Sequence, residues 1–304
     1  MTKKVLVVMG GFSAEREVSL VTGKNVVKAL KKAGYKVSGY DLKNGFKLIE
    51  KIKKEKPDVV FNALHGNFGE DGEIQGLLDI LQIPYTHSGL KSSVLGMDKE
   101  LTKVVAMGQN IPVAPSQKMT FAEFKQNKIK IKIPYVVKPV CDGSSVGVFI
   151  VKNEHDKKKV FYEDDKREIL VEKFIDGQEL TVTVLNDKAL AVTELRVKEG
   201  FYDYKAKYTK GITQHILPAE VSKDVYEEAK NYALLLHKAL GCCVVSRSDF
   251  IYSQKDGLVF LEVNTNPGMT PLSLVPEQAK YAGISYEELC SMLVENARCR
   301  NLKD

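Results

Sequence analysis

Cysteine is scarce in this chain, which has five cysteines among 304 residues and no CxxC pair. An odd number without paired spacing argues against a disulfide framework and against a zinc site. Long apolar runs are also absent, because no stretch reaches the ~18 apolar residues that a membrane span needs. The N-terminal segment joins a charged start to a short apolar run with no cleavage site, so it predicts a strand rather than a signal peptide. These absences predict a reduced, cytoplasmic protein.

Positive charge is in modest excess over negative charge, with a formal net charge of +6 that comes mostly from lysine. The lysines are scattered in groups such as Lys51, Lys53 and Lys54, which is typical of solvated helix faces. No aromatic residues alternate with them as a nucleic-acid platform would need, so we expect no nucleic-acid partner. A basic balance also suits small anionic substrates such as nucleotides. Composition does not choose between these two interpretations.

Short apolar runs alternate with amphipathic segments over the first third of the chain. The pattern predicts strands at 5–9, 36–40, 58–62 and 83–86, and helices at 17–32, 45–55 and 73–81. This βαβα order indicates an open parallel sheet covered by helices. Ligands of such sheets bind beyond the carboxyl ends of the strands, where the loops at 10–17 and 65–72 would lie.

The pattern changes after about residue 97 and becomes α+β. It predicts helices at 99–107 and 223–240, and strands at 135–138, 148–151, 169–173, 179–185, 189–196, 244–252 and 258–263. The strands at 169–173 and 179–185 look like a pair hinged at Gly177. No internal repeat or low-complexity segment is present.

The last two predicted strands have the sharpest chemical pattern. Glu262 and Asn264 are two residues apart and therefore share one face of a strand. A hairpin through 253–257 would bring Asp249 opposite them, and Arg247 shares the face of Asp249. Two carboxylates and an amide oxygen suit Mg²⁺, and a neighbouring cation suits a substrate carboxylate or an oxyanion. A lattice of salt bridges between the strands is the alternative.

Two central segments suit a nucleotide. The segment 138–147, KPVCDGSSVG, begins with Lys138 and ends in a Gly/Ser-rich turn whose N–H groups can cradle phosphate oxygens. It lacks the order of a Walker A loop, and a flexible hairpin is the alternative. In 172–179, EKFIDGQE, Glu172 suits an adenine amino group and Glu179 suits ribose hydroxyls. Exposed strand charges are the alternative there.

Two further loops contain polar residues of interest. The segment 202–208, YDYKAKY, resembles a lid whose lysine reaches a γ-phosphate, unless it is an ordinary surface loop. At the predicted strand ends, Glu15 suits an ammonium group and His65 suits a role in orienting that carboxylate. Glu70 and Asp71 lie on the same loop as His65, which is otherwise a structural histidine. The spacing near Glu15 does not match GxGxxG.

Taken together, the motifs resemble the D-alanine–D-alanine ligase family of the ATP-grasp superfamily. The segments that carry the resemblance are GGFSAEREVSL (10–20), LHGNFGEDG (64–72), GMDKELTK (96–103), KPVCDGSSVG (138–147), EKFIDGQE (172–179), FYDYKAKY (201–208), SRSDF (246–250) and EVNTNPGMTPLSLVP (262–276). The resemblance implies an N-terminal open parallel-sheet, substrate-binding domain at 1–97. A two-part ATP-grasp fold would follow, with a central subdomain at 98–185 and a catalytic domain at 186–304.

The resemblance also implies a role for each site residue. It implies nucleotide contacts from Lys99, Lys138, Ser145, Glu172, Lys173 and Glu179, with Lys207 at the phosphates. It implies two Mg²⁺ or Mn²⁺ ions on Asp249, Glu262 and Asn264. It implies Glu15 at the ammonium group of the first D-alanine, with His65 among the substrate-binding residues. Ser144 and Tyr208 are implied to join Glu15 in a hydrogen-bonded set that closes the lid. For the oxyanion it implies Arg247 and the N–H of Gly268, and for the second D-alanine Ser273 and Leu274.

The implied activity is ATP-dependent ligation of two D-alanines through a D-alanyl phosphate, for peptidoglycan precursors, by a homodimer. Tyr208 favours an amine as the second substrate, because relatives that form a depsipeptide with D-lactate tend to have a histidine there. A depsipeptide ligase or another ATP-grasp carboxylate–amine ligase is the alternative. A nucleotide-binding regulatory module without catalysis would lack a metal ligand or Arg247, and the sequence has them all.

Overall fold

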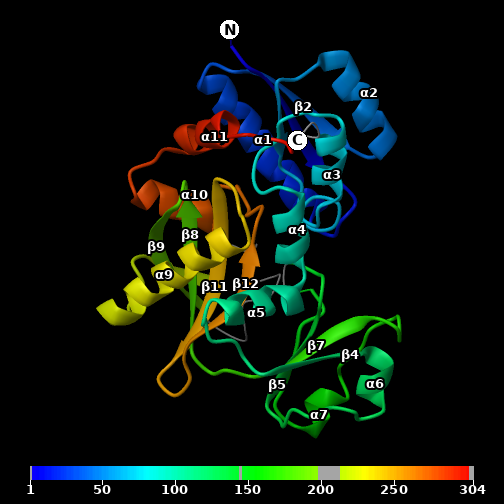
Figure 1. The fold of residues 1–304 in the computed structure, drawn as a ribbon, viewed down its shortest axis with the longest axis vertical. Helices are drawn as coiled ribbons and strands as arrows, with labels where there is room; N and C mark the ends of the chain where they lie inside the picture. Colours follow the sequence, from blue (N-terminus) through cyan, green and yellow to red (C-terminus); the bar gives the residue numbers. More distant parts are fainter. Residues whose placement is uncertain (1, 144–145, 198–212, 301–304) are drawn as a thin grey trace.

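The computed structural model describes residues 2–143, 146–197 and 213–300. Three sheets are present in these ranges (Figure 1). The three-stranded sheet lies at one end of the long axis, the four-stranded sheet lies at the other end, and the five-stranded sheet lies between them. Among the described residues, no helix has both the length and the apolar character needed to cross a membrane.

The N-terminal sheet is parallel, as predicted. Its strands are β1 (Lys4–Gly10), β2 (Lys36–Leu42) and β3 (Val59–Asn62) in the order β2-β1-β3. The helices that cover it are α1 (Arg16–Lys32), α2 (Gly45–Glu55) and α3 (Glu73–Ile80). The central strand is buried from Val5 onward, as a parallel strand covered on both faces should be. Its carboxyl end therefore delivers the loop with Glu15 to the edge of the sheet.

The prediction of a strand at 83–86 is wrong. Only Tyr85 forms bridges there, one to Val60 and one to Arg298. Pro84 lacks an N–H donor, and positive φ values of 53° at Gln82 and 72° at His87 end the extended path on either side. The segment therefore runs along β3 for a single residue.

The end of the chain returns to the N-terminal sheet. Helix α11 (Tyr286–Glu295) packs on α1, and Leu289 and Leu293 share a core with Val26 and Leu30. Periodicity along the chain predicts an apolar helix face but does not identify its partner.

The four-stranded sheet is antiparallel. Its strands are β4 (Ser116–Thr120), β5 (Tyr135–Pro139), β6 (Phe149–Val151) and β7 (Glu168–Lys173), in the order β4-β7-β5-β6. Two short helices accompany it, α6 (Phe121–Lys125) and α7 (Glu154–Lys157). Aromatic side chains such as Phe121, Phe124, Tyr135 and Tyr162 form its core through edge-to-face contacts.

The five-stranded sheet is antiparallel, with the order β10-β9-β8-β11-β12. Its strands are β8 (Gln178–Leu185), β9 (Lys188–Val197), β10 (Thr213–Ile216), β11 (Val245–Ser253) and β12 (Gly257–Asn264). The helices around it are α4 (Leu90–Met97), α5 (Lys99–Gly108), α9 (Lys223–Ala239) and α10 (Leu274–Tyr281).

The two strands predicted to be hinged at Gly177 belong to different sheets, β7 to the four-stranded and β8 to the five-stranded one. A Cβ at Gly177 would lie 2.1 Å from the carbonyl oxygen of Tyr252, so only glycine fits at this changeover. Strand pairing thus groups β8 with the elements that follow it. The division of the chain at 97 and 185 stays a prediction.

Candidate active site

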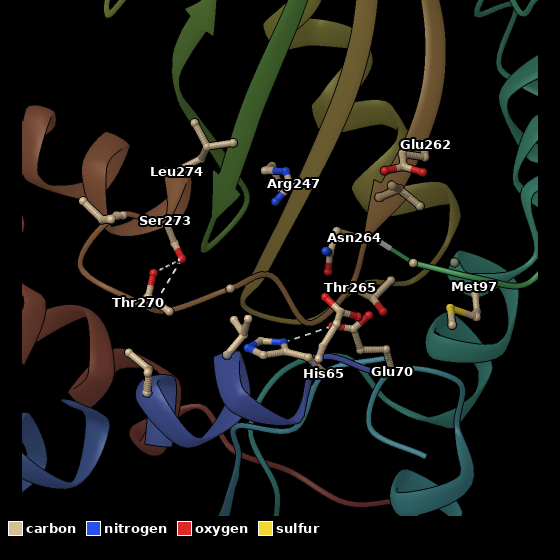
Figure 2. Close-up of a pocket in the computed structure, with 18 of the residues that line it drawn as sticks. His65, Glu70, Met97, Arg247, Glu262, Asn264, Thr265, Thr270, Ser273 and Leu274 are labelled. Atoms are coloured by element: carbon tan, nitrogen blue, oxygen red, sulfur yellow. Dashed lines mark hydrogen bonds and ion pairs between the residues drawn. The ribbon is translucent and has the colours of Figure 1, made fainter. Parts of the chain in front are cut away.

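Two cavities adjoin where the three sheets meet. The first, of about 590 Å³, is lined by loops of the N-terminal sheet, by the β11–β12 hairpin and by the loop before α10 (Figure 2). Its lining includes Glu15, His65, Glu70, Arg247, Asn264, Gly268, Ser273 and Leu274. The second, of about 170 Å³, lies between the four-stranded and five-stranded sheets and is lined by Lys138, Glu172, Lys173, Glu179 and Asp249 among others.

Among the residues that the structure describes, three line both cavities: Lys99, Asp142 and Glu262. The predicted substrate residues thus gather in the first cavity, and the predicted nucleotide residues gather in the second. Lys99 stands at the junction, where its ammonium donates to the carbonyl oxygen of Asp142. The predicted contacts of Ser144, Ser145, Lys207 and Tyr208 lie outside the described residues.

The β11–β12 hairpin brings the predicted metal ligands together. Asp249 pairs with Glu262, and Arg247 pairs with Asn264, across the antiparallel ladder. Asp249 lines the second cavity, Asn264 the first, and Glu262 both. The predicted register is therefore confirmed, and the three oxygen donors lie at the boundary of the two cavities.

This donor set fits Mg²⁺ or Mn²⁺ in its chemistry. Such ions take one or two carboxylates and complete their shell with water and phosphate oxygens. Within the described ranges, no group of three or more His, Cys, Asp or Glu side chains could hold a metal ion by itself. The two carboxylates and the Asn264 amide oxygen would leave the rest of such an ion's shell to water or to oxygens of a bound ligand.

Asp249 is held from two sides. The Thr181 hydroxyl on β8 donates to its Oδ1 at 2.6 Å. Arg247 donates from Nε to Oδ1 at 2.9 Å and from Nη2 to Oδ2 at 2.7 Å. This two-point contact fixes the plane of the guanidinium, whose residue also lines the first cavity. This ion pair connects two residues of one strand, Arg247 and Asp249, rather than two strands.

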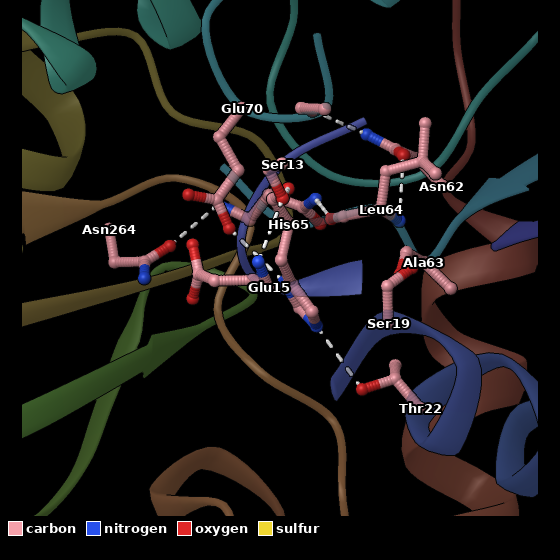
Figure 3. A network of polar contacts seen from close by, with 12 residues as sticks. Ser13, Glu15, Ser19, Thr22, Asn62, Ala63, Leu64, His65, Glu70 and Asn264 are labelled. Atoms are coloured by element: carbon pink, nitrogen blue, oxygen red, sulfur yellow. Dashed lines mark hydrogen bonds and ion pairs between the residues drawn. The ribbon is translucent and has the colours of Figure 1, made fainter. Parts of the chain in front are cut away.

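A second polar network surrounds Glu15 and His65 (Figure 3). His65 is buried, with its Nδ1 at 3.1 Å from Glu70 Oε1 and its Nε2 at 3.1 Å from Thr22 Oγ1. Burial alone would lower the pKa of His65, but the hydrogen bond to Glu70 and the charges of Glu70 and Glu15 outweigh it and raise that pKa. Burial and the nearby Glu15 charge raise the pKa of Glu70.

Two glycines let Glu15 fit between neighbouring loops. A Cβ at Gly66, whose φ is +67°, would lie 3.0 Å from Glu15 Oε2, and one at Gly143 would lie 3.4 Å from the same atom. The loop at 65–72 and the segment at Gly143 therefore both approach the carboxylate of Glu15. Glu70 belongs to this site, although the sequence analysis placed it on the loop without a role. A carboxylate five residues after a buried histidine was the available signal.

The loop after β12 forms the far wall of the first cavity. Ser273 Oγ lies 3.0 Å from the backbone N of Thr270, which donates to it, and 2.8 Å from Thr270 Oγ1 (Figure 2). A Cβ at Gly268 would lie 3.0 Å from Ser273 Oγ, so the loop folds tightly over itself there. Leu274 is the first residue of α10, and the N–H groups at such a helix start suit an anionic group.

The second cavity contains a buried ion cluster. Glu172 is 4% exposed, so the alternative of exposed strand charges is wrong for this residue. Lys138 contacts its Oε1 at 2.6 Å, and Lys103 on α5 contacts its Oε2. Lys173, which also lines this cavity, pairs with Asp256 at 2.6 Å. Lys103 was in the predicted helix at 99–107 but received no role, because its partner is distant in the sequence.

Comparisons with known proteins agree with the family resemblance seen in the motifs. A family profile described as D-ala D-ala ligase C-terminus matches residues 105–295, and one described as D-ala D-ala ligase N-terminus matches residues 41–88. The D-alanine–D-alanine ligase of Zymomonas mobilis is 51% identical over an alignment of 304 residues. The alignment covers 97% of this chain and 94% of that protein. The enzyme of the same name from Sphingopyxis alaskensis is 51% identical, with 96% of this chain and 97% of that protein covered.

Comparison with solved structures gives the same result as comparison of sequences. The D-alanine–D-alanine ligase of Bacillus anthracis in complex with ATP superposes with a TM-score of 0.81 at 34% identity, covering 97% of each chain. The VanG D-Ala:D-Ser ligase of Enterococcus faecalis gives a TM-score of 0.80 at 28% identity, covering 97% of this chain and 99% of that one. The matches confirm the fold and the ATP-dependent ligase class predicted from the motifs, and the chain belongs to the D-alanine–D-alanine ligase family.

Proposed function

We propose that the protein joins two molecules of D-alanine into D-alanyl-D-alanine, with ATP converted to ADP and phosphate, for peptidoglycan precursors. One observation carries this proposal: the cavity lined by the predicted nucleotide-binding residues and the cavity lined by the predicted substrate-binding residues share Lys99 and Glu262. A γ-phosphate in one cavity and a carboxylate in the other can react only at such a junction.

The chemistry explains why both cavities are needed. A carboxylate is a poor acyl donor, because its leaving group would be oxide. Transfer of the γ-phosphoryl group to the first D-alanine makes an acyl phosphate, and the amine of the second D-alanine displaces phosphate from it. Lysines near the transferring group neutralise its charge, and closure against water protects the acyl phosphate. In this proposal Lys99 and Lys138 bind phosphates, with Lys207 beside them.

The remaining nucleotide contacts come from the second cavity. Glu172 accepts from the adenine amino group, Glu179 binds the ribose hydroxyls, and Lys173 and Ser145 complete the set. Asp249, Glu262 and Asn264 hold two Mg²⁺ or Mn²⁺ ions, which when bound polarise the phosphate oxygens and offset their charge. The position of these three side chains at the boundary of the cavities supports this assignment.

The first cavity holds the two amino acids. Glu15 binds the ammonium group of the first D-alanine, and His65 and Glu70 hold the surrounding loop, with Ser144 and Tyr208 completing the set at the lid. Arg247 and the N–H of Gly268 stabilise the tetrahedral oxyanion, where one such donor contributes about 3–4 kcal/mol. Ser273 and Leu274 bind the second D-alanine.

The test is release of phosphate from ATP and Mg²⁺ with D-alanine, L-alanine, D-serine with D-alanine, or D-lactate with D-alanine, with products identified by mass. We expect phosphate and a D-alanyl-D-alanine dipeptide with D-alanine alone, and no product with L-alanine. Preferred formation of a D-serine or D-lactate product would refute the choice of second substrate. The homodimer and the cytoplasmic location stay predictions, and sedimentation of the purified protein tests the first.

A further inference from the structure

Lys103 lies behind the wall of the nucleotide cavity. Its side chain is 3% exposed and projects from α5, where the ammonium donates to Glu172 Oε2 and, at 3.1 Å, to the carbonyl oxygen of Ala114. Lys138 contacts the other oxygen of the same carboxylate at 2.6 Å. One buried carboxylate therefore lies between two buried ammonium groups, and the three groups together carry one excess positive charge.

The two lysines are not equivalent. Lys138 and Glu172 line the second cavity, whereas Lys103 is absent from its lining. Lys138 also stands at the end of β5, next to the loop predicted to cradle phosphates. A bound nucleotide can therefore reach Lys138 but not Lys103.

A conflict arises when Lys138 engages a phosphate. Its ammonium must then share or leave the Glu172 carboxylate, and a buried charge without a partner is strongly unfavourable. Lys103 removes this cost, because it keeps one oxygen of Glu172 paired whatever Lys138 does. Burial by itself raises the pKa of Glu172, but the charges of Lys138 and Lys103 and their hydrogen bonds outweigh burial and lower it, so the carboxylate stays ionised.

We propose that Lys103 is a positioning residue for ATP: it neutralises and orients Glu172 from behind, and so leaves Lys138 available to the phosphates. This inference rests on the proposed function only in placing ATP phosphates at Lys138. Lys103 touches no reacting atom. Without it, Lys138 becomes the sole partner of Glu172 within the described part of the chain and is retained by that carboxylate.

The test is a double-mutant cycle on the full-length protein, with the affinity for ATP and Mg²⁺ measured by calorimetry. We expect Lys103→Met to weaken ATP binding by about tenfold or more, because a buried pair is strongly coupled. The same substitution in a Glu172→Gln background should cost less than about threefold, because no carboxylate then retains Lys138. Lys103→Arg, which preserves the charge, should bind ATP better than Lys103→Met.

Steady-state kinetics supply a readout that a general loss of structure would not give. We expect Lys103→Met to raise the KM for ATP while the KM for D-alanine stays within about twofold of wild type. An equal loss of ATP affinity in both Glu172 backgrounds, or an unchanged affinity in Lys103→Met, would overturn the proposal. If Lys103→Met fails to fold, the comparison of Glu172→Gln with the double variant Lys103→Met/Glu172→Gln decides by itself. An ATP affinity more than about threefold weaker in the double variant would overturn the proposal.

The binding arm is independent of the ligation assay. If the wild-type protein bound ATP but formed no D-alanyl dipeptide, the proposed function would fail while the cycle at Lys103 could still succeed. If the protein ligated D-alanine and the cycle showed no coupling, only the role of Lys103 would fail.

Discussion

Asp249 and Glu262 lie directly opposite each other on β11 and β12, two carboxylates paired across one antiparallel ladder. Like charges in this arrangement repel. Arg247 and Thr181 both donate to Asp249, and the ammonium of Lys99 lies 4.0 Å from Glu262 Oε2. The hairpin thus holds two acidic groups opposite each other, each with a cationic side chain nearby.

Removal of one of these charges should stop the reaction without unfolding the protein. We expect Glu262→Gln to lower the rate of ligation by at least about 100-fold, because a bound metal ion supplies several kcal/mol of charge stabilisation. Initial rates over a range of Mg²⁺ concentrations and a thermal unfolding curve measure the two effects. Glu163→Gln, at an exposed position, is the control. Normal turnover of Glu262→Gln with an ordinary Mg²⁺ dependence would refute the metal assignment.

Two buried threonines on β8 offer a matched test of how Asp249 is held. Thr181 donates to Asp249, whereas the hydroxyl oxygen of Thr183 has no hydrogen-bond partner within the described part of the chain. We expect Thr181→Val to raise the Mg²⁺ or Mn²⁺ concentration for half-saturation by about 10–100-fold, as loss of a contact to a metal ligand does. Thr183→Val should change it by less than about twofold.

Mn²⁺ binding measured by electron paramagnetic resonance, in the presence of ATP, checks this difference apart from activity. Equal effects of Thr181→Val and Thr183→Val would show that the Thr181 hydroxyl does not position Asp249.

The pair of His65 and Glu70 should make stability depend on pH. The pKa of His65 is raised above its ordinary value of 6.5. The stability that the protonated His65 adds to the folded protein is therefore fully present below about pH 6.5, and it is lost as pH rises through the folded-state pKa. The raised pKa of Glu70 acts in the same direction, because ionising this buried carboxyl opposes folding. The advantage of wild type over Glu70→Gln in free energy of unfolding should therefore shrink as pH rises above about 6.5.

Urea unfolding at several pH values measures this advantage. Glu73→Gln, at an exposed position on the adjoining helix, is the control and should follow wild type at every pH. A difference between wild type and Glu70→Gln that stays constant with pH would contradict the pairing of Glu70 with His65.

Gly177, where the chain passes from the four-stranded sheet to the five-stranded sheet, should not tolerate a side chain. We expect Gly177→Ala to lower the free energy of unfolding by about 1–3 kcal/mol, the usual cost of overpacking, because its Cβ would meet the Tyr252 carbonyl. Gly45→Ala, where a Cβ meets nothing within 4 Å, should be neutral or stabilising by up to ~1 kcal/mol. Chemical denaturation of both variants makes the comparison, and equal stabilities would exclude the steric conflict.

The sequence by itself determined the local elements and much of the site. Alternation with period two placed Glu262 and Asn264 on one face, and the short turn at 253–257 placed Asp249 opposite them. Helix periodicity predicted α1, α2 and α9 to within two residues at each end. These features depend on neighbours along the chain or across a tight turn, so residue spacing alone is enough to predict them.

Only the tertiary structure decided which distant groups meet. It brought Lys103 of α5 to Glu172 of β7, placed β8 in a different sheet from β7, and packed α11 on α1. Periodicity identifies a buried face or a strand but not its partner, because packing between elements far apart in sequence depends on the shape of the whole core. The charge pairs that set the chemistry of this site follow from that packing.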